Sequence, residues 1–536
     1  MSDQTSRVRI PGGGSKACAL TAPIDILMML PYGIKCGDTH LRYSALIFVA
    51  ILVLAAIPIA ANPTATSPAS VRQSSQLAYE GDGLLSGVPY VWQEINGFCA
   101  WAATAMAMQH AGAPVELHDL FALSTVGFSY AYIRFNDTML MFPGAIYQQV
   151  EPTKLATDLY GLNFSIYLDG GLTGAELQTQ LWAAQGINAQ LLDGQNAAFN
   201  LMRQSIDDGH PLIASVDPSW LPPHDYDILR NQGLTGGGHG VLITGYNDTS
   251  RNATILDPGV GSFGEDFGYP DDGRYEYNIT YTDLYLAWSS RYYISILIKP
   301  GDGPVHDPSS LLGPHIRNRL LGVGTSYSPD AASAYIWQFG EKGFRMMSSD
   351  MTVEGLSSFL SVFDGIQNER EFKTSLLLFI GLGLEAQTTL QYLSYWTALA
   401  RLPALMPDVN LTDFTAAGEQ ALPHFEALAD NSSLINPGNL TFRDSLAFGT
   451  FWHIADIYNS TGDMEDALAQ FRTDLNAISA HLLGIADSWQ SAGNALTEIW
   501  PNDFFIVYGP IVAVAGVAVV AFVIAIIWWI RKTPSQ

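Results

Sequence analysis

The sequence has few basic residues and few cysteines. Only 25 of its 536 residues are Lys or Arg, against 51 Asp or Glu, which gives a net charge of −26. Because nucleic-acid binding relies on basic surfaces, this charge argues against a nucleic-acid partner. Three cysteines are too few for a disulfide framework. The Glu-x-x-His, His-Glu-x-x-His and glycine-rich phosphate-loop motifs are also missing, so we expect no metal ion and no cofactor.

Apolar residues are abundant. Hydrophobic residues make up 48% of the chain and aromatic residues 11%, which excludes a disordered acidic protein. The length is sufficient for two or three domains with a sizeable core.

Two apolar segments carry no charge. Residues 504–530 are long enough to cross a bilayer and are followed by Arg531 and Lys532. Residues 44–61 are shorter, and they fit either a transmembrane signal anchor or a signal peptide that is cleaved. Basic flanks stay in the cytoplasm, so both alternatives place residues 62–503 on the extracellular side of the cell membrane, with the lipid bilayer as a partner.

Glycosylation motifs support this orientation. Nine Asn-x-Ser/Thr sequons lie between the two apolar segments, and none lies outside them. We expect several of the nine to be glycosylated: Asn136, Asn163, Asn247, Asn252, Asn278, Asn410, Asn431, Asn439 and Asn459.

Changes in composition divide the chain into segments. We expect a cytoplasmic tail or long signal n-region (1–43), the first apolar segment (44–61), a linker (62–84), a mixed domain (85–305), a second linker (306–330), an all-α region (331–500), a transmembrane helix (504–530) and a cytoplasmic tail (531–536). The all-α region fits a spacer, a lid or an oligomerisation bundle.

The mixed domain reads as α+β. Helical patterns over 100–111, 174–185 and 198–208 precede short β-rich runs. Those runs are 212–216, 240–246, 254–256, 275–280 and 292–298. Helices followed by short strands predict an antiparallel sheet.

Cys99 is the only cysteine between the apolar segments. The Asn96-Gly97 turn precedes it, and helix-forming residues follow from Ala100. A helix N-terminus favours the thiolate, which is the nucleophilic form of cysteine. Gln93 lies six residues upstream, where its amide could join the Cys99 backbone N–H in an oxyanion hole.

A thiolate nucleophile needs a histidine partner. His210 and His239 both follow glycine and precede an apolar strand. His239 opens the strand that follows three glycines, and a second short strand ends at Asp257-Pro258. A hairpin could place His239 and Asp257 on one face of the sheet, where Asp257 would fix the imidazole tautomer.

These blocks resemble the papain-like cysteine peptidases of the bacteriocin-leader-processing, double-glycine peptidase-like type. The matching residues are Pro89, Tyr90 and Gln93, then Asn96 and Cys99, then the strand from His239 to Tyr246, then Asp257 and Pro258. The resemblance covers about residues 85–300.

The resemblance implies a papain-like fold and a role for each residue. Cys99 would be the nucleophile, His239 the general base, Asp257 the orienting residue and Gln93 an oxyanion-hole donor. It places His210 on a core strand, and Asn247 remains a rival to Asp257 as the third residue.

Three functions fit these motifs. The first is a membrane-anchored, outward-facing cysteine peptidase that hydrolyses a peptide or protein substrate through an acyl-enzyme. The second is a thiol acyltransferase or amidase that uses the same site. The third is a non-enzymatic surface protein that uses a papain-like scaffold for binding or assembly.

Overall fold

The computed structural model describes most of residues 81–501. The gaps are 95–96, 136–137, 144–150, 173, 185, 232–234, 236, 261–274, 324–334, 352–386, 430–459 and 461–463. Both apolar segments, 44–61 and 504–530, lie outside the described residues. Among the helices that are described, none is long and apolar enough to span a bilayer.

A mixed sheet forms the centre of the first half of the described chain. Its eight strands are β1 (Asp82–Leu84), β4 (Asn163–Asp169), β5 (Asn188–Leu192), β6 (Leu212–Val216), β7 (His239–Asn247), β8 (Asn252–Leu256), β9 (Glu276–Thr280) and β10 (Ser295–Lys299). The order is β5-β4-β10-β6-β7-β8-β9, with β1 paired to β7. Only β4 and β5 are paired in parallel; the other neighbours in this sheet are antiparallel.

The central strands are buried on both faces. In β7, Val241 and Ile243 belong to one apolar cluster, whereas Leu242 belongs to another. Leu212 and Ile213 of β6 alternate in the same way. Because side chains of a strand alternate between faces, these strands read as continuous apolar runs and must be covered on both sides.

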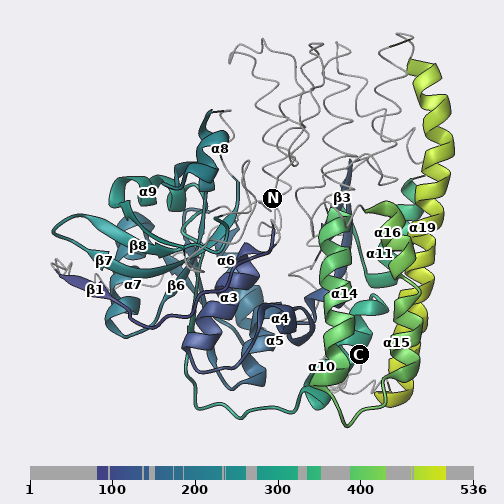
Figure 1. Cartoon of the computed structure of the whole chain (residues 1–536), viewed down its shortest axis with the longest axis horizontal. Helices are drawn as coiled ribbons and strands as arrows, with labels where there is room; N and C mark the ends of the chain where they lie inside the picture. The colour runs from purple at the N-terminus through teal and green to yellow at the C-terminus, as the bar shows by residue number, and fades with distance from the viewer. Residues whose placement is uncertain are drawn as a thin grey trace, which may run out of the picture.

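Helices lie on both faces of the sheet and beside it. They are α3 (Cys99–His110), α4 (Leu117–Leu123), α5 (Pro152–Leu159), α6 (Ala175–Ala184), α7 (Gly194–Asp207), α8 (Asp227–Asn231) and α9 (Tyr281–Ser289). Three short 3-10 turns accompany them: η2 (Val126–Phe128), η3 (Pro218–Trp220) and η4 (His224–Tyr226). Figure 1 shows α3, α4 and α5 between the sheet and the second half of the chain. Residues of α7 and α9 pack on the other face.

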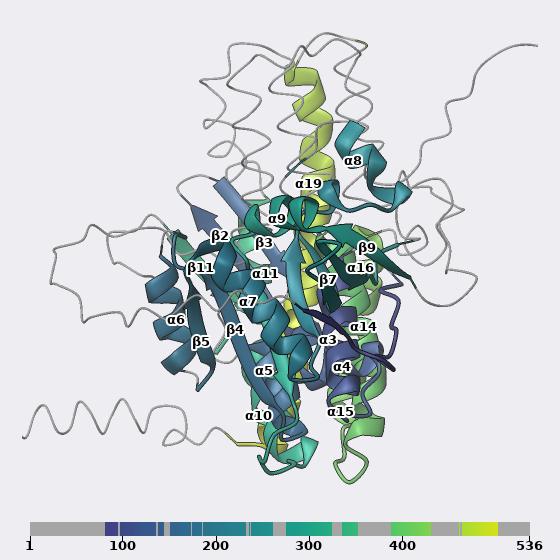
Figure 2. The same ribbon diagram turned by 90° about the vertical axis from the view of Figure 1, so that its left-hand side faces the viewer.

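The second half of the described chain is mainly helical. It contains α10 (Pro308–Leu320), α11 (Gly340–Asp350), α14 (Gln387–Leu405), α15 (Thr412–Glu419), α16 (Leu422–Leu428) and α19 (Met464–Ile499). The long helix α19 runs along its outer side in Figure 1, and in Figure 2 it is seen behind the sheet. A smaller sheet, β11-β2-β3, joins β11 (Tyr335–Phe339) to β2 (Tyr130–Phe135) and β3 (Thr138–Pro143).

The α+β expectation is confirmed, but the sheet is mixed and not wholly antiparallel, because β4 and β5 pair in parallel. The structure also differs from the expected segments at three places, the first being strand β1, which lies at the end of the segment expected as the first linker and pairs with β7. Helix α10 lies in the segment expected as a linker, where Asp307 caps the backbone N–H of Ser309. Its buried residues Leu312, Ile316 and Leu320 recur every fourth position, which is the spacing of an apolar helix face. Strand β11 lies at the start of the region expected to be all-α. It pairs with β2, about two hundred residues earlier in the chain, and local periodicity does not reveal such a distant partner.

The two halves of the chain share one hydrophobic core. A single cluster of buried residues extends from Val88 to Leu496. Helix α14 packs on α4 and η2, and the Gln391 amide donates to the carbonyl oxygen of Gly127 at 3.0 Å. The helical half therefore supports the helices behind the sheet rather than forming a separate body.

Replacement of Gly127 by alanine tests this contact. A Cβ at Gly127 would lie 2.4 Å from the Cβ of Ala398 and 2.5 Å from the carbonyl oxygen of Ser394. We expect Gly127→Ala to lower the free energy of unfolding by about 1–3 kcal/mol through overpacking. In the control, Gly170→Ala, the new Cβ would meet nothing closer than 3.4 Å. Equal denaturant midpoints for the two variants would contradict the packing of α14 on η2.

Candidate active site

Cys99 is the first residue of α3. Gly97, which precedes it by two residues, has φ +110°, and this left-handed conformation lets the chain turn into the helix. The sulfur is near the backbone N–H groups of Ala100 and Gly240, which stabilise its thiolate. Cys99 is a free cysteine, and the residue as a whole is partly exposed.

His239 is the first residue of β7, and this strand packs directly against α3. A Cβ on Gly240 would lie 2.9 Å from the Cα of Ala100 and 3.0 Å from its nitrogen. No side chain fits in that space, so glycine at position 240 is what lets the strand approach the helix N-terminus. This approach brings His239 into hydrogen-bond contact with Cys99.

Each group of this pair shifts the pKa of the other. Burial alone would raise the pKa of Cys99, but the charge and hydrogen bond of His239 lower it below the usual value. Burial alone would lower the pKa of His239, but the charges of Asp257 and Cys99 raise it to about 10. Both shifts favour a thiolate paired with an imidazolium.

Asp257 follows β8, which forms an antiparallel hairpin with β7. Its side chain is fully buried, and its Oδ1 lies 2.8 Å from Nε2 of His239. Burial raises the pKa of Asp257, but His239 and other donors outweigh this effect and lower the pKa below the usual value. With Nε2 facing this carboxylate, the other ring nitrogen, Nδ1, is left for the Cys99 thiol.

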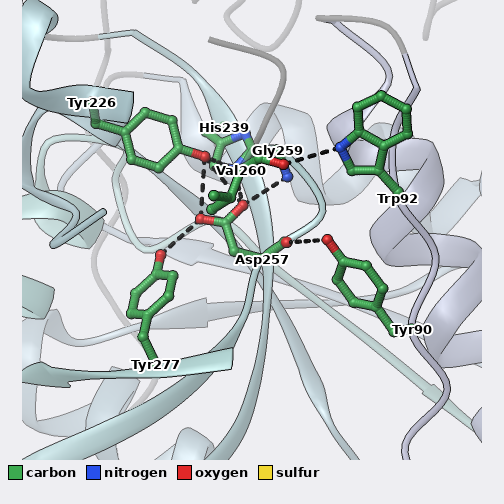
Figure 3. A network of polar contacts seen from close by, with 8 residues as sticks. All are labelled: Tyr90, Trp92, Tyr226, His239, Asp257, Gly259, Val260 and Tyr277. Atoms are coloured by element: carbon green, nitrogen blue, oxygen red, sulfur yellow. Dashed lines mark hydrogen bonds and ion pairs between the residues drawn. The ribbon is translucent and has the colours of Figure 1, made fainter. Parts of the chain in front are cut away.

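Gln93 is fully buried beside the Asp257 loop. Its backbone N–H donates to the carbonyl oxygen of Pro258 at 3.0 Å. Two neighbouring side chains tie the same segments together (Figure 3): the Tyr90 hydroxyl donates to the Asp257 carbonyl oxygen and the Trp92 indole to the Val260 carbonyl oxygen, both at 3.0 Å. The stretch before Cys99 is thus fastened to the loop that carries Asp257.

Two tyrosines at this site were not expected from the sequence. The hydroxyls of Tyr226 and Tyr277 both donate to the Asp257 carboxylate (Figure 3). Tyr226 ends the 3-10 turn η4, and Tyr277 lies on β9. No motif marks either residue, because each reaches the site only through the fold. The one sequence signal is that residues 275–280, which contain Tyr277, form one of the expected β-rich runs.

The rival residues lie elsewhere. Asn247 is at the opposite end of β7 from His239, a separation of roughly 26 Å along an extended strand. Its side-chain oxygen accepts the backbone N–H of Ser250 in a turn. His210 lies just before β6, at the end of that strand that is distant from His239 and Cys99. Its charged neighbours are His110, Asp208 and Lys299. Neither residue is part of the Cys99 cluster.

The structure describes five of the nine predicted glycosylation sites. Asn163, Asn278 and Asn410 are exposed, and Asn247 and Asn252 are half-buried. Asn136, Asn431, Asn439 and Asn459 lie outside the described residues, as does Asn96 of the cysteine motif.

Comparison with known families agrees with the resemblance found in the sequence. Residues 85–283 match the model of the Peptidase_C39 like family. Over this part of the chain the match supports a papain-like C39 cysteine peptidase domain, and cysteine peptidase activity is what the family suggests. A search of curated proteins found no match.

Gly240→Ala tests whether the close approach of β7 to α3 creates the reactive thiol. The new methyl group would push β7 away from α3 and weaken the Cys99–His239 contact. We expect alkylation of Cys99 by iodoacetamide at pH 6 to slow about tenfold or more, because each unit of increase in the thiol pKa removes about tenfold of the thiolate. The rate is read from the mass of the Cys99 peptide.

Gly237→Ala is the matched control from the same segment. Its Cβ would meet nothing closer than 3.6 Å, which is an ordinary contact. An unchanged alkylation rate in Gly240→Ala would show that the strand approach does not activate the thiol.

Proposed function

We propose that the protein is a cysteine peptidase that hydrolyses peptide bonds through a thiol acyl-enzyme. The observation that carries this proposal is the chain of contacts from Cys99 through the buried His239 to the buried Asp257, in which the carboxylate lies 2.8 Å from the imidazole. The match to the Peptidase_C39 like family supports it independently.

The first step uses the thiolate at the start of α3. The Cys99 sulfur attacks the carbonyl carbon of the scissile peptide bond, and a sulfur–carbon bond forms while the carbonyl electrons move to oxygen. The backbone N–H of Cys99 and the side-chain amide of Gln93 would bind this oxyanion. Such donors are already oriented before the reaction, so they stabilise the developing charge without reorganisation.

The second step uses the proton of the imidazolium. When the carbon–nitrogen bond breaks, His239 gives its proton to the leaving amine. The neutral imidazole then accepts a proton from water, and the resulting hydroxide attacks the thioester. The acid product leaves, and Cys99 and His239 return to the ion pair. Asp257 holds the imidazole in one orientation throughout and stabilises its positive charge.

Variants of the proposed triad test this function. With a library of internally quenched peptides, we expect Cys99→Ala to abolish cleavage and His239→Ala to lower kcat/KM by about 10³-fold or more. His210→Ala removes an imidazole that lies outside the site, and we expect activity close to that of the parent protein. Thermal unfolding of each variant checks that a loss of activity is not a loss of folded protein.

Three results would decide against peptide hydrolysis. Cleavage by Cys99→Ala, or a Cys99 that reacts with an epoxide probe only after denaturation, would remove the proposed nucleophile. If added amines capture the acyl group in place of water, the same site acts as an acyltransferase.

We further propose that the domain faces outward and is anchored by residues 504–530. The apolar length of that segment, its basic flank and the sequons between the two apolar segments support this orientation. The described sequons are also accessible, since none of the five asparagines is buried. A peptide or protein substrate would then be met outside the cell.

Truncation tests the anchor. We expect the full chain, expressed in eukaryotic cells, to stay with membranes after a carbonate wash. A chain ending at Asp503 is released into the medium if residues 44–61 are a cleaved signal peptide, and stays with membranes if they are a signal anchor. We also expect an N-glycosidase to lower the mass of both forms, because glycans are added only to segments that enter the secretory lumen. This orientation would be contradicted if the carbonate wash removed the full chain from membranes and the N-glycosidase left its mass unchanged.

A further inference from the structure

The Asp257 carboxylate is held by more donors than the catalytic histidine alone. Its Oδ1 accepts from Nε2 of His239 and from the backbone N–H of Gly259, both at 2.8 Å. Its Oδ2 accepts from the Tyr277 hydroxyl at 2.7 Å. The Tyr226 hydroxyl lies 3.1 Å from both oxygens (Figure 3).

This number of donors matches what a buried carboxylate requires. Asp257 is 0% exposed, and a carboxylate out of contact with bulk water is stabilised only by charges and hydrogen bonds from the protein. Its two oxygens offer about four acceptor positions. His239, Gly259, Tyr226 and Tyr277 together provide four donors.

Tyr226 also contacts the imidazole. Its hydroxyl lies 3.1 Å from Nε2 of His239, and its ring centroid is 5.6 Å from that of the imidazole. Gly259 leaves space for this arrangement, because a Cβ there would lie 2.8 Å from the Tyr226 hydroxyl and 2.5 Å from Cε1 of His239. One hydroxyl thus touches both the base and its carboxylate partner.

We propose that Tyr226 and Tyr277 are positioning residues that keep Asp257 ionised and directed at His239. This inference rests on the proposed function, and it assigns the tyrosines no contact with substrate. Tyr277 acts on the carboxylate alone. Tyr226 acts on the carboxylate and the imidazole together, and so limits the rotation of the ring.

The protonation states agree with this assignment. Burial and the charge of Asp257 raise the pKa of both tyrosines well above 10, so both hydroxyls remain donors wherever the thiolate pair exists. The titratable and charged groups that face the network come from four elements and one turn. They are Cys99 on α3, Tyr226 on η4, His239 on β7, Tyr277 on β9 and, in the turn after α9, Arg291, whose charge reaches Cys99.

Loss of a tyrosine donor changes the pH range of the ion pair. With one donor fewer, the pKa of Asp257 rises, so the carboxylate takes up a proton at a higher pH. A protonated Asp257 no longer stabilises the imidazolium. The plot of Cys99 reactivity against pH has an acid limb, where the ion pair is lost as the pH falls, and a basic limb, where it is lost as the pH rises. The acid limb therefore moves to higher pH. Both limbs report the coupled network and not one residue.

The experiment measures the rate of Cys99 alkylation by iodoacetamide against pH in the full chain, which needs no knowledge of the substrate. We expect Tyr277→Phe to move the acid limb up by about one pH unit, since a hydrogen bond to a charged group is worth about that much. We expect Tyr226→Phe to do the same and also to lower the basic limb, because it touches His239 as well.

Tyr281→Phe is the matched control. It removes a tyrosine hydroxyl that donates to another carboxylate, Asp248, at 2.8 Å and that has no contact with Asp257. We expect its pH profile to match that of the parent protein, and thermal unfolding checks that all three variants are folded.

The outcomes separate this inference from the proposed function. If Cys99 of the parent protein reacts only near the pH of an ordinary thiol, the proposed function fails. If the parent has a low acid limb that neither Tyr226→Phe nor Tyr277→Phe moves, the positioning role alone is overturned. A slower rate with unmoved limbs also overturns it, because that result indicates only structural support.

Discussion

The close approach of strand β7 to the N-terminus of helix α3 is the contact on which the candidate site depends. Gly240 permits it, because any side chain there would collide with the backbone of Ala100. The approach joins two favourable features of the thiolate: the N–H groups at the start of a helix, and the imidazolium of His239. Neither element alone would bring Cys99 and His239 together.

The remainder of the site makes this contact rigid. The β7–β8 hairpin presents Asp257 to His239, and the segment from Tyr90 to Gln93 is hydrogen-bonded to the loop after Asp257. The carboxylate is buried without becoming neutral, since its pKa is lowered by the groups around it. On the far side of α3 and α4, helix α14 belongs to the same hydrophobic core. The helical half is therefore part of the scaffold that holds Cys99.

Local patterns in the sequence predicted a large part of this arrangement. The turn before Cys99, the apolar strand after His239 and the strand that ends at Asp257 were all visible, because each depends on neighbours in the chain. Tyr226 and Tyr277 were not, since a tyrosine hydroxyl that reaches a buried carboxylate leaves no periodic signal. Strand β11 was missed because its partner, β2, lies far away in the chain. The apolar segments 44–61 and 504–530 lie outside the described residues and stay predictions.

A direct measurement of the Cys99 thiolate tests the central claim. The ultraviolet absorbance of the thiolate, taken as the difference between the parent protein and Cys99→Ala, can be followed against pH. The account predicts a thiolate at neutral pH that is lost in His239→Ala, because the imidazolium lowers the thiol pKa. A difference absorbance that develops only near pH 9, the ordinary value for a cysteine, would contradict it.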